Sequence, residues 1–144
     1  MRVQRLAICA LALWLSACGD GPTEPSDPDG LLSGGVLATF AVGNDQFKVW
    51  VTDGVAINRV LALSRGEPGG QIPNARIRRG SGRGEHNSPF SWHLDPADIQ
   101  IVDVAIELCD GNPRFVEQNI AEYVDRITRY CPWGARLVSV TDYR

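Results

Sequence analysis

The N-terminus most constrains how this 144-residue chain can fold, because it marks the chain for export. Two arginines precede an apolar stretch over 6–15, and small residues then lead to Cys18. A basic start, a short apolar stretch and a small-residue cleavage site are the three parts of a secretory signal. The apolar stretch of about ten residues is too short to span a bilayer as a helix. We therefore expect residues 1–17 to be removed and the rest to fold outside the cytosol.

The cleavage site also predicts a lipid anchor. Leu15-Ser16-Ala17-Cys18 resembles the end of a bacterial lipoprotein signal peptide. That resemblance implies that Cys18 becomes the first mature residue and carries acyl chains, which anchor a protein without a spanning helix. Gly19, rather than an aspartate, follows it, and lipoprotein sorting then favours the outer membrane in a cell that has one. The alternative is an ordinary secretory signal with an incidental cysteine.

Residues 18–35 are predicted to be a tether. They contain three prolines, several glycines and four acidic residues, and no aromatic residue. Such a segment buries too little apolar surface to order itself, and chain statistics give it a reach of roughly 20 Å. Residues 36–144 have the size of one globular domain, with no internal repeat or second linker.

The mature chain is acidic. Removal of Arg2 and Arg5 with the signal changes the formal net charge from −3 to −5. This charge argues against nucleic acid as the main partner.

Two of the four cysteines remain for the domain. Cys9 leaves with the signal and Cys18 is the predicted lipid site, so Cys109 and Cys131 are left. In an oxidising compartment we expect them to form a disulfide. The alternative is a reactive or metal-binding pair, although no Cys-x-x-Cys spacing favours redox chemistry.

Hydrophobic periodicity predicts the order β-β-α-β-β-β-α-β. The predicted strands cover 36–42, 46–52, 75–79, 90–95, 101–108 and 136–140, and the predicted helices cover 54–65 and roughly 114–130. Turn residues between the first two strands favour a hairpin, and Asp53 and Gly66 begin and end the first helix. We expect a single α+β domain with a mainly antiparallel sheet, two helices packed on one face and one disulfide.

The candidate binding surface combines the polar loop over 80–89 with the strand that follows. That strand alternates, so its polar side chains share the face opposite its apolar ones. The surface comprises Arg83, His86, Asn87, Ser91, His93 and Asp95. The two histidines could also ligate a metal beside a carboxylate, but their spacing matches no compact ligand motif. We predict no metal site and no cofactor.

A basic cluster and an indole each allow two interpretations. Arg76, Arg78, Arg79 and Arg83 would suit a phosphate, a carboxylate or an acidic partner. The simpler interpretation is a solvated edge strand, where positive charge blocks pairing with other strands. Trp50 would suit sugar or peptide binding if it is exposed; the simpler interpretation is packing under a helix or loop.

Catalytic motifs are absent from the sequence. It has no His-Glu-x-x-His, Gly-x-Ser-x-Gly or Walker-type loop. The rival hypothesis is a small envelope hydrolase that uses His93 with Glu107 or Asp103, which requires hydrogen-bond reach between them. Acidic residues on the polar face of a strand more often serve solvation.

Several short segments, taken together, resemble the small secreted domains related to BP-seventy-four. They are 72–77, 86–87, 91–96, 106–111 and 130–133. The resemblance runs from about Ala38 to Val140 and implies an exported single domain in which Cys109 and Cys131 pair. It carries no activity, cofactor or catalytic residue.

The leading functional expectation is a non-enzymatic binding or interaction module, held outside the cell membrane by lipid on Cys18. Its possible partners are an envelope protein or a glycan. A third hypothesis is a module that shapes an envelope assembly and binds no small ligand.

Overall fold

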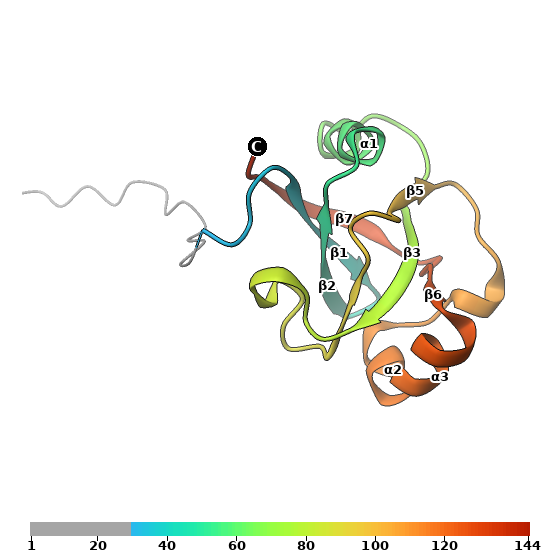
Figure 1. The fold of residues 1–144 in the computed structure, drawn as a ribbon. Helices are drawn as coiled ribbons and strands as arrows, with labels where there is room; N and C mark the ends of the chain where they lie inside the picture. Colours follow the sequence, from blue (N-terminus) through green and yellow to red (C-terminus); the bar gives the residue numbers. More distant parts are fainter. Residues whose placement is uncertain (1–29) are drawn as a thin grey trace, which may run out of the picture.

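A computed structural model describes residues 30–144 of the chain. The predicted signal over 1–17, the lipidation site Cys18 and most of the tether over 18–35 lie outside the described residues. Among the described residues, no helix has the length and apolar character needed to cross a membrane. The fold is α+β, with two antiparallel sheets (Figure 1).

The first sheet joins the two ends of the domain. β1 (Val36–Val42) lies between β2 (Asp45–Val51) and β7 (Arg136–Asp142), and both neighbours run antiparallel to it. Gly43, at φ +59°, allows the tight turn between β1 and β2. Val36, Ala38 and Phe40 of β1 are fully buried. The predicted hairpin and the predicted last strand are therefore confirmed.

Helix α1 (Gly54–Ser64) forms where the sequence predicts it. Asp53 caps it, because its Oδ1 accepts hydrogen bonds from the backbone N–H groups of Val55 (3.0 Å) and Ala56 (2.9 Å). Ile57 and Val60 are buried, and the helix packs against β7 and against β5 (Gln100–Val102).

The second sheet is organised around β3 (Ile72–Arg79). This strand pairs with β4 (Trp92–Leu94), with β5 and with β6 (Arg129–Tyr130), always antiparallel. β3 is therefore a central strand, and the prediction that its arginines protect a sheet edge is wrong. The prediction failed because a cluster of arginines occurs both on edge strands and on the solvent-facing side of a central strand.

The predicted strand over 101–108 is the main error in the sequence analysis. β5 ends at Val102, and 103–106 is irregular before a 3₁₀ turn, η2 (Glu107–Cys109). The reason is register: Val102 pairs with Ile72, the first residue of β3, so no partner strand remains for the residues that follow. The backbone at Gly70 packs directly against Val102 and Asp103 instead.

The second helical region is broken into pieces. α2 (Pro113–Gln118) is capped by Asn112, whose Oδ1 accepts the N–H of Phe115 at 2.8 Å. α3 (Ile120–Glu122) and a π-helical turn, η3 (Tyr123–Ile127), follow. Thr128 at φ +64° ends the region, and the last predicted residues form β6.

Aromatic rings join the two sheets into one core. Phe47 of β2 lies 5.8 Å from Trp92 of β4 and 5.5 Å from Tyr130 of β6, measured between ring centroids. The disulfide between Cys109 and Cys131 lies in a second, smaller buried cluster with Ile72. The predicted class, α+β with antiparallel strands and one disulfide, is confirmed. The strands divide between two sheets, and α1 lies at the opposite end of the domain from α2 and α3 (Figure 1).

Candidate functional site

The open face of the second sheet carries a set of polar side chains. Ala75 and Ile77 of β3 are buried, so the alternating residues Arg76 and Arg78 point to the other side. We call this the polar face, made by Asn74, Arg76, Arg78, Ser91, His93, Asp95 and Arg129. Its registers are fixed: Arg78 lies opposite His93, Arg76 opposite Arg129 and Asn74 opposite Gln100.

Carboxylates neutralise part of this positive charge. Arg78 Nη2 lies 3.0 Å from Asp95 Oδ2, and Arg129 Nη1 lies 2.9 Å from Asp98 Oδ2. Burial alone would raise the pKa of Asp95, but hydrogen bonds from the Ala97 N–H and from Arg78 outweigh it and hold the pKa below its usual value. Asp95 therefore remains a carboxylate paired with Arg78.

Arg76 is the arginine of the polar face that has no direct ion pair within residues 30–144, although its charge helps to lower the pKa of Asp95. Its backbone N–H donates to Asp98 Oδ2 at 2.7 Å. Within residues 30–144, its guanidinium forms no hydrogen bond and no ion pair, and its side chain is exposed. A fully charged guanidinium with free donors on an open sheet face suits a carboxylate or phosphate.

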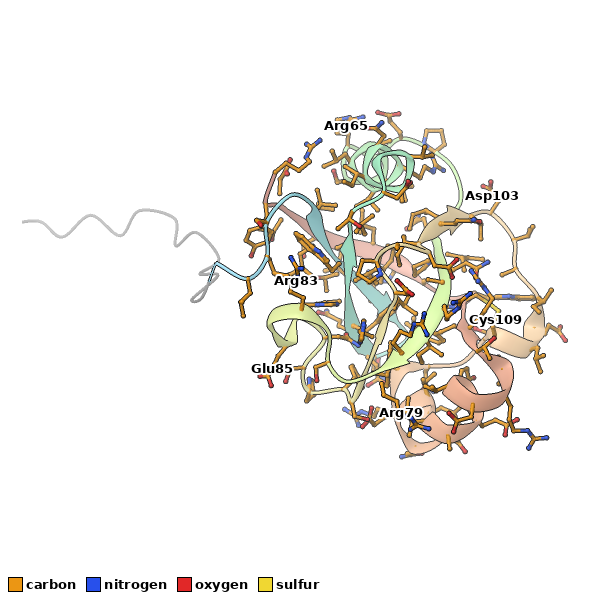
Figure 2. All side chains as sticks on the ribbon, in the orientation of Figure 1. Arg65, Arg79, Arg83, Glu85, Asp103 and Cys109 are labelled. Atoms are coloured by element: carbon orange, nitrogen blue, oxygen red, sulfur yellow. A yellow bond between two sulfur atoms is a disulfide. The ribbon has the colours of Figure 1, made fainter. Side chains whose placement is uncertain are left out.

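Of the six candidate residues, four lie in the loop over 80–91, whereas His93 lies in β4 and Asp95 directly follows it. Arg83 and Ser91 are exposed, His93 and Asp95 are half-buried, and His86 and Asn87 are buried. Figure 2 shows Arg83 on the outer turn of this loop. Within the described chain, its guanidinium has no ion-pair partner. The exposed members can contact a ligand, whereas the buried members support the loop.

The two histidines are both held by backbone carbonyls. His86 Nδ1 lies 3.0 Å from the oxygen of Arg83, and His93 Nδ1 lies 2.7 Å from the oxygen of Gly80. Their ring centroids are 6.0 Å apart. Burial lowers the pKa of His86, so this imidazole remains neutral. Across residues 30–144, no group of three or more His, Cys, Asp or Glu side chains is arranged to hold a metal ion.

Comparison with known proteins gives a family. A family model described as the BP-seventy-four N-terminal domain matches residues 36–144. The chain belongs to the BP-seventy-four N-terminal domain family. No curated protein and no solved structure gives a match. The resemblance inferred from the sequence is thus confirmed, and it extends over the whole folded part of this BP-seventy-four N-terminal domain.

The hydrolase hypothesis requires a pair that this BP-seventy-four domain does not form. His93 lies opposite Arg78, whereas Val102, next to Asp103, lies opposite Ile72. Ile72 and Arg78 are six positions apart on β3, or roughly 20 Å along a strand. Within the described residues, no hydrogen bond or ion pair joins His93 to Asp103 or Glu107. Figure 2 shows Asp103 beside β5, far from Arg79 at the other end of β3.

A cleft adjoins the polar face of the BP-seventy-four domain. It lies between α1 and the segment 97–102 and has a volume of about 530 Å³. Asp98 and Gln100 line it and also belong to the neighbourhood of Arg76 and Arg129. Its apolar walls come from residues such as Ala56 and Ile101. Its volume is that of a small-ligand site.

Trp50 does not contribute to a binding surface. The residue is only 2 % exposed, and its ring lies against Gly35 and edge-on to Tyr143. The packing interpretation is therefore confirmed, and the interpretation as an exposed sugar-binding indole is wrong.

The sequence analysis missed Asp98 and Arg129, which reach the polar face from distant segments. Neither residue belongs to a pattern that could have identified it.

Proposed function

We propose that this protein is an extracytoplasmic binding module that is lipid-anchored through Cys18 and binds a carboxylate-bearing glycan on its polar face. Arg76 carries this proposal, because it offers free guanidinium donors at the centre of a sheet face whose other arginines are already paired. Arginine binds carboxylates through two parallel hydrogen bonds, which adds geometric specificity. An acidic surface of an envelope protein is the alternative ligand.

The surroundings of Arg76 suit a sugar. Asn74, Ser91 and His93 supply groups that hydrogen-bond hydroxyls, and the cleft beside Asp98 and Gln100 adds an apolar wall. A glycan that lies along the sheet would contact the guanidinium of Arg76 and extend from there into the cleft. The hydrolase alternative lacks this support, because His93 is held by Gly80 and not by a carboxylate.

The predicted location agrees with the chemistry of the domain. The disulfide between Cys109 and Cys131 is typical of proteins that fold outside the cytosol. The signal residues and Cys18 supply the proposed anchor, and the acidic tether would hold the domain away from lipid. The proposed ligands are envelope components, and nucleic acid is excluded from the proposal because the mature chain is acidic.

Binding of polygalacturonate to the full chain, purified as the cell exports it, tests the glycan proposal. We expect binding that weakens with salt, while neutral dextran does not bind. Arg76→Gln should weaken binding about tenfold, because it removes a charge-assisted contact. Arg65→Gln is the matched control, since Arg65 carries the same charge at the end of α1 and already pairs with Glu67 (Figure 2). Equal loss in both variants, or equal binding of dextran, would contradict the proposal.

A further inference from the structure

An exposed apolar surface follows β5, the outer strand of the second sheet. Val104 is 81 % exposed, Ile106 and Leu108 are each 66 % exposed, and Trp133 is 45 % exposed. We call these four residues the apolar edge. Single exposed apolar residues are common, but here Val104 and Trp133 line one small cavity, and Ile106 and Leu108 follow Val104 closely in the chain. Exposed apolar residues gathered in this way mark an interaction site.

The backbone of the apolar edge is open to pairing. Ile106 is in an extended conformation, and β5, which precedes it, is an outer strand of its sheet. Within residues 30–144, the N–H groups of Val104, Ala105 and Ile106 donate no hydrogen bond. Free backbone donors beside an outer strand, in a segment that is extended at Ile106 and exposes Val104 and Ile106, can accept an added strand.

Covalent and polar contacts hold the apolar edge in place. The disulfide joins Cys109, which ends η2, to Cys131, two residues before Trp133. The Cys131 N–H donates to the Cys109 oxygen at 2.8 Å, and the Trp133 N–H donates to Asp110 Oδ1, also at 2.8 Å. These contacts hold the segment that carries Trp133 against the end of η2 before a partner arrives, which reduces the entropy cost of binding.

A small cavity beside the apolar edge indicates what the partner carries. It has a volume of about 210 Å³, and it is lined by Ile72, Asp103, Val104, Ala105 and Trp133. An indole and a carboxylate in one apolar cavity suit the guanidinium or ammonium of a basic side chain. Asp103 and Glu107 are both exposed, and within the described chain neither has an ion-pair partner. The charge of this surface is thus complementary to a basic segment.

We propose that the apolar edge binds an extended protein segment, whose basic side chain enters the cavity between Trp133 and Asp103 and whose apolar side chains cover Val104, Ile106 and Leu108. The segment pairs through its backbone with the free N–H groups after β5. Figure 2 shows Asp103 and Cys109 on the side of the domain opposite the blue start of the described chain. This site is separate from the polar face.

A labelled peptide tests the proposal on the full chain, purified as the cell exports it. The peptide has nine residues that alternate threonine and valine, with arginine at the centre, and its matched control has glutamate there. We expect the arginine peptide to bind at least tenfold more tightly. Trp133→Ala and Val104→Ser should each weaken it about tenfold, and Asp103→Asn should remove most of the preference for arginine.

Control variants separate this site from general effects. Phe115→Ala removes another half-exposed aromatic ring, and Glu85→Gln removes an exposed acid on the opposite side (Figure 2); neither should change peptide binding. Circular dichroism checks the fold, and Val104→Ser tests the surface without altering the core.

Equal affinity for both peptides would overturn the proposal. Self-association of the protein that Val104→Ser abolishes would also overturn the proposal. Binding of the protein to phosphatidylglycerol vesicles that Val104→Ser abolishes would overturn it as well. Binding of polygalacturonate should be unchanged, which keeps the two sites distinguishable.

Discussion

Asn87 and His86 are buried polar residues in the loop that leads into β4, and their contacts are structural. Asn87 Oδ1 accepts the Lys48 N–H at 2.8 Å, and its Nδ2 donates to the Trp92 oxygen at 2.8 Å. One side chain therefore joins β2 to β4, and a buried amide that lost these partners would cost about 1–3 kcal/mol for each unpaired group. The loop can present Arg83 and His93 because these buried neighbours fix its shape.

His86 gives the domain a pH-dependent component of stability. Because burial lowers the pKa of His86, the unfolded chain binds a proton at this residue at a higher pH than the folded chain does. Stability is then fully present above the unfolded value of about 6.5 and is lost as pH falls toward the lowered pKa. We expect the fall in unfolding free energy between pH 7.5 and pH 5, measured with urea, to be smaller in His86→Gln. An equal fall in both proteins would contradict this.

At the scale of elements, the disulfide connects the end of η2 to the residue that follows β6. Loss of a cross-link over a loop of this length costs roughly 3 kcal/mol. We expect Cys109→Ser with Cys131→Ser to lower the melting temperature by about 10 °C. Amide exchange should also rise more in 103–110 than in β1, which has two paired neighbours. Uniform acceleration across both segments would show that the cross-link has only a global effect.

The elements that the sequence predicts well are those determined by local signals. The hairpin of β1 and β2 follows from alternation and a glycine turn, and α1 follows from Asp53 and a helical stripe. The alternation of 91–95 likewise predicts the polar side of β4. The segment 101–108 has the same alternation, yet it forms a strand only as far as Val102, because β3 begins at Ile72 and offers no further partner. Register between distant strands decides such cases, and sequence periodicity does not contain it.

The membership of the candidate site also depends on register between distant strands, which sequence periodicity does not contain. His93 and the arginines of β3 could be predicted as polar residues on strands. Their juxtaposition could not, because it depends on Arg78 lying opposite His93. Asp98 and Arg129 reach the face from a turn and from a two-residue strand, and neither segment has a periodic signal. Sequence patterns therefore identified the kinds of residue at the site, and tertiary pairing selected its members.

At the scale of the whole molecule, the proposed anchor would keep both binding surfaces, the polar face and the apolar edge, at the cell envelope. A domain that is tethered to lipid meets nearby ligands at a high effective concentration, so modest affinities can suffice. The polar face and the apolar edge are separate, so one module could hold a glycan and a protein segment together. This arrangement works only if the chain remains at the membrane, which makes Cys18 the residue to test.

We expect Cys18→Ser to release the protein from the membrane, because the acyl chains on Cys18 supply the proposed attachment. In bacteria fed labelled palmitate, the natural chain should incorporate label and sediment with membranes. The Cys18→Ser chain should do neither, while its folded domain and its disulfide remain intact. Cys9→Ser is the matched control, since Cys9 lies within the predicted signal and its loss should change neither label nor location. Mass spectrometry of the N-terminal peptide decides the matter: an unmodified product that keeps residues 1–17 would contradict the anchor.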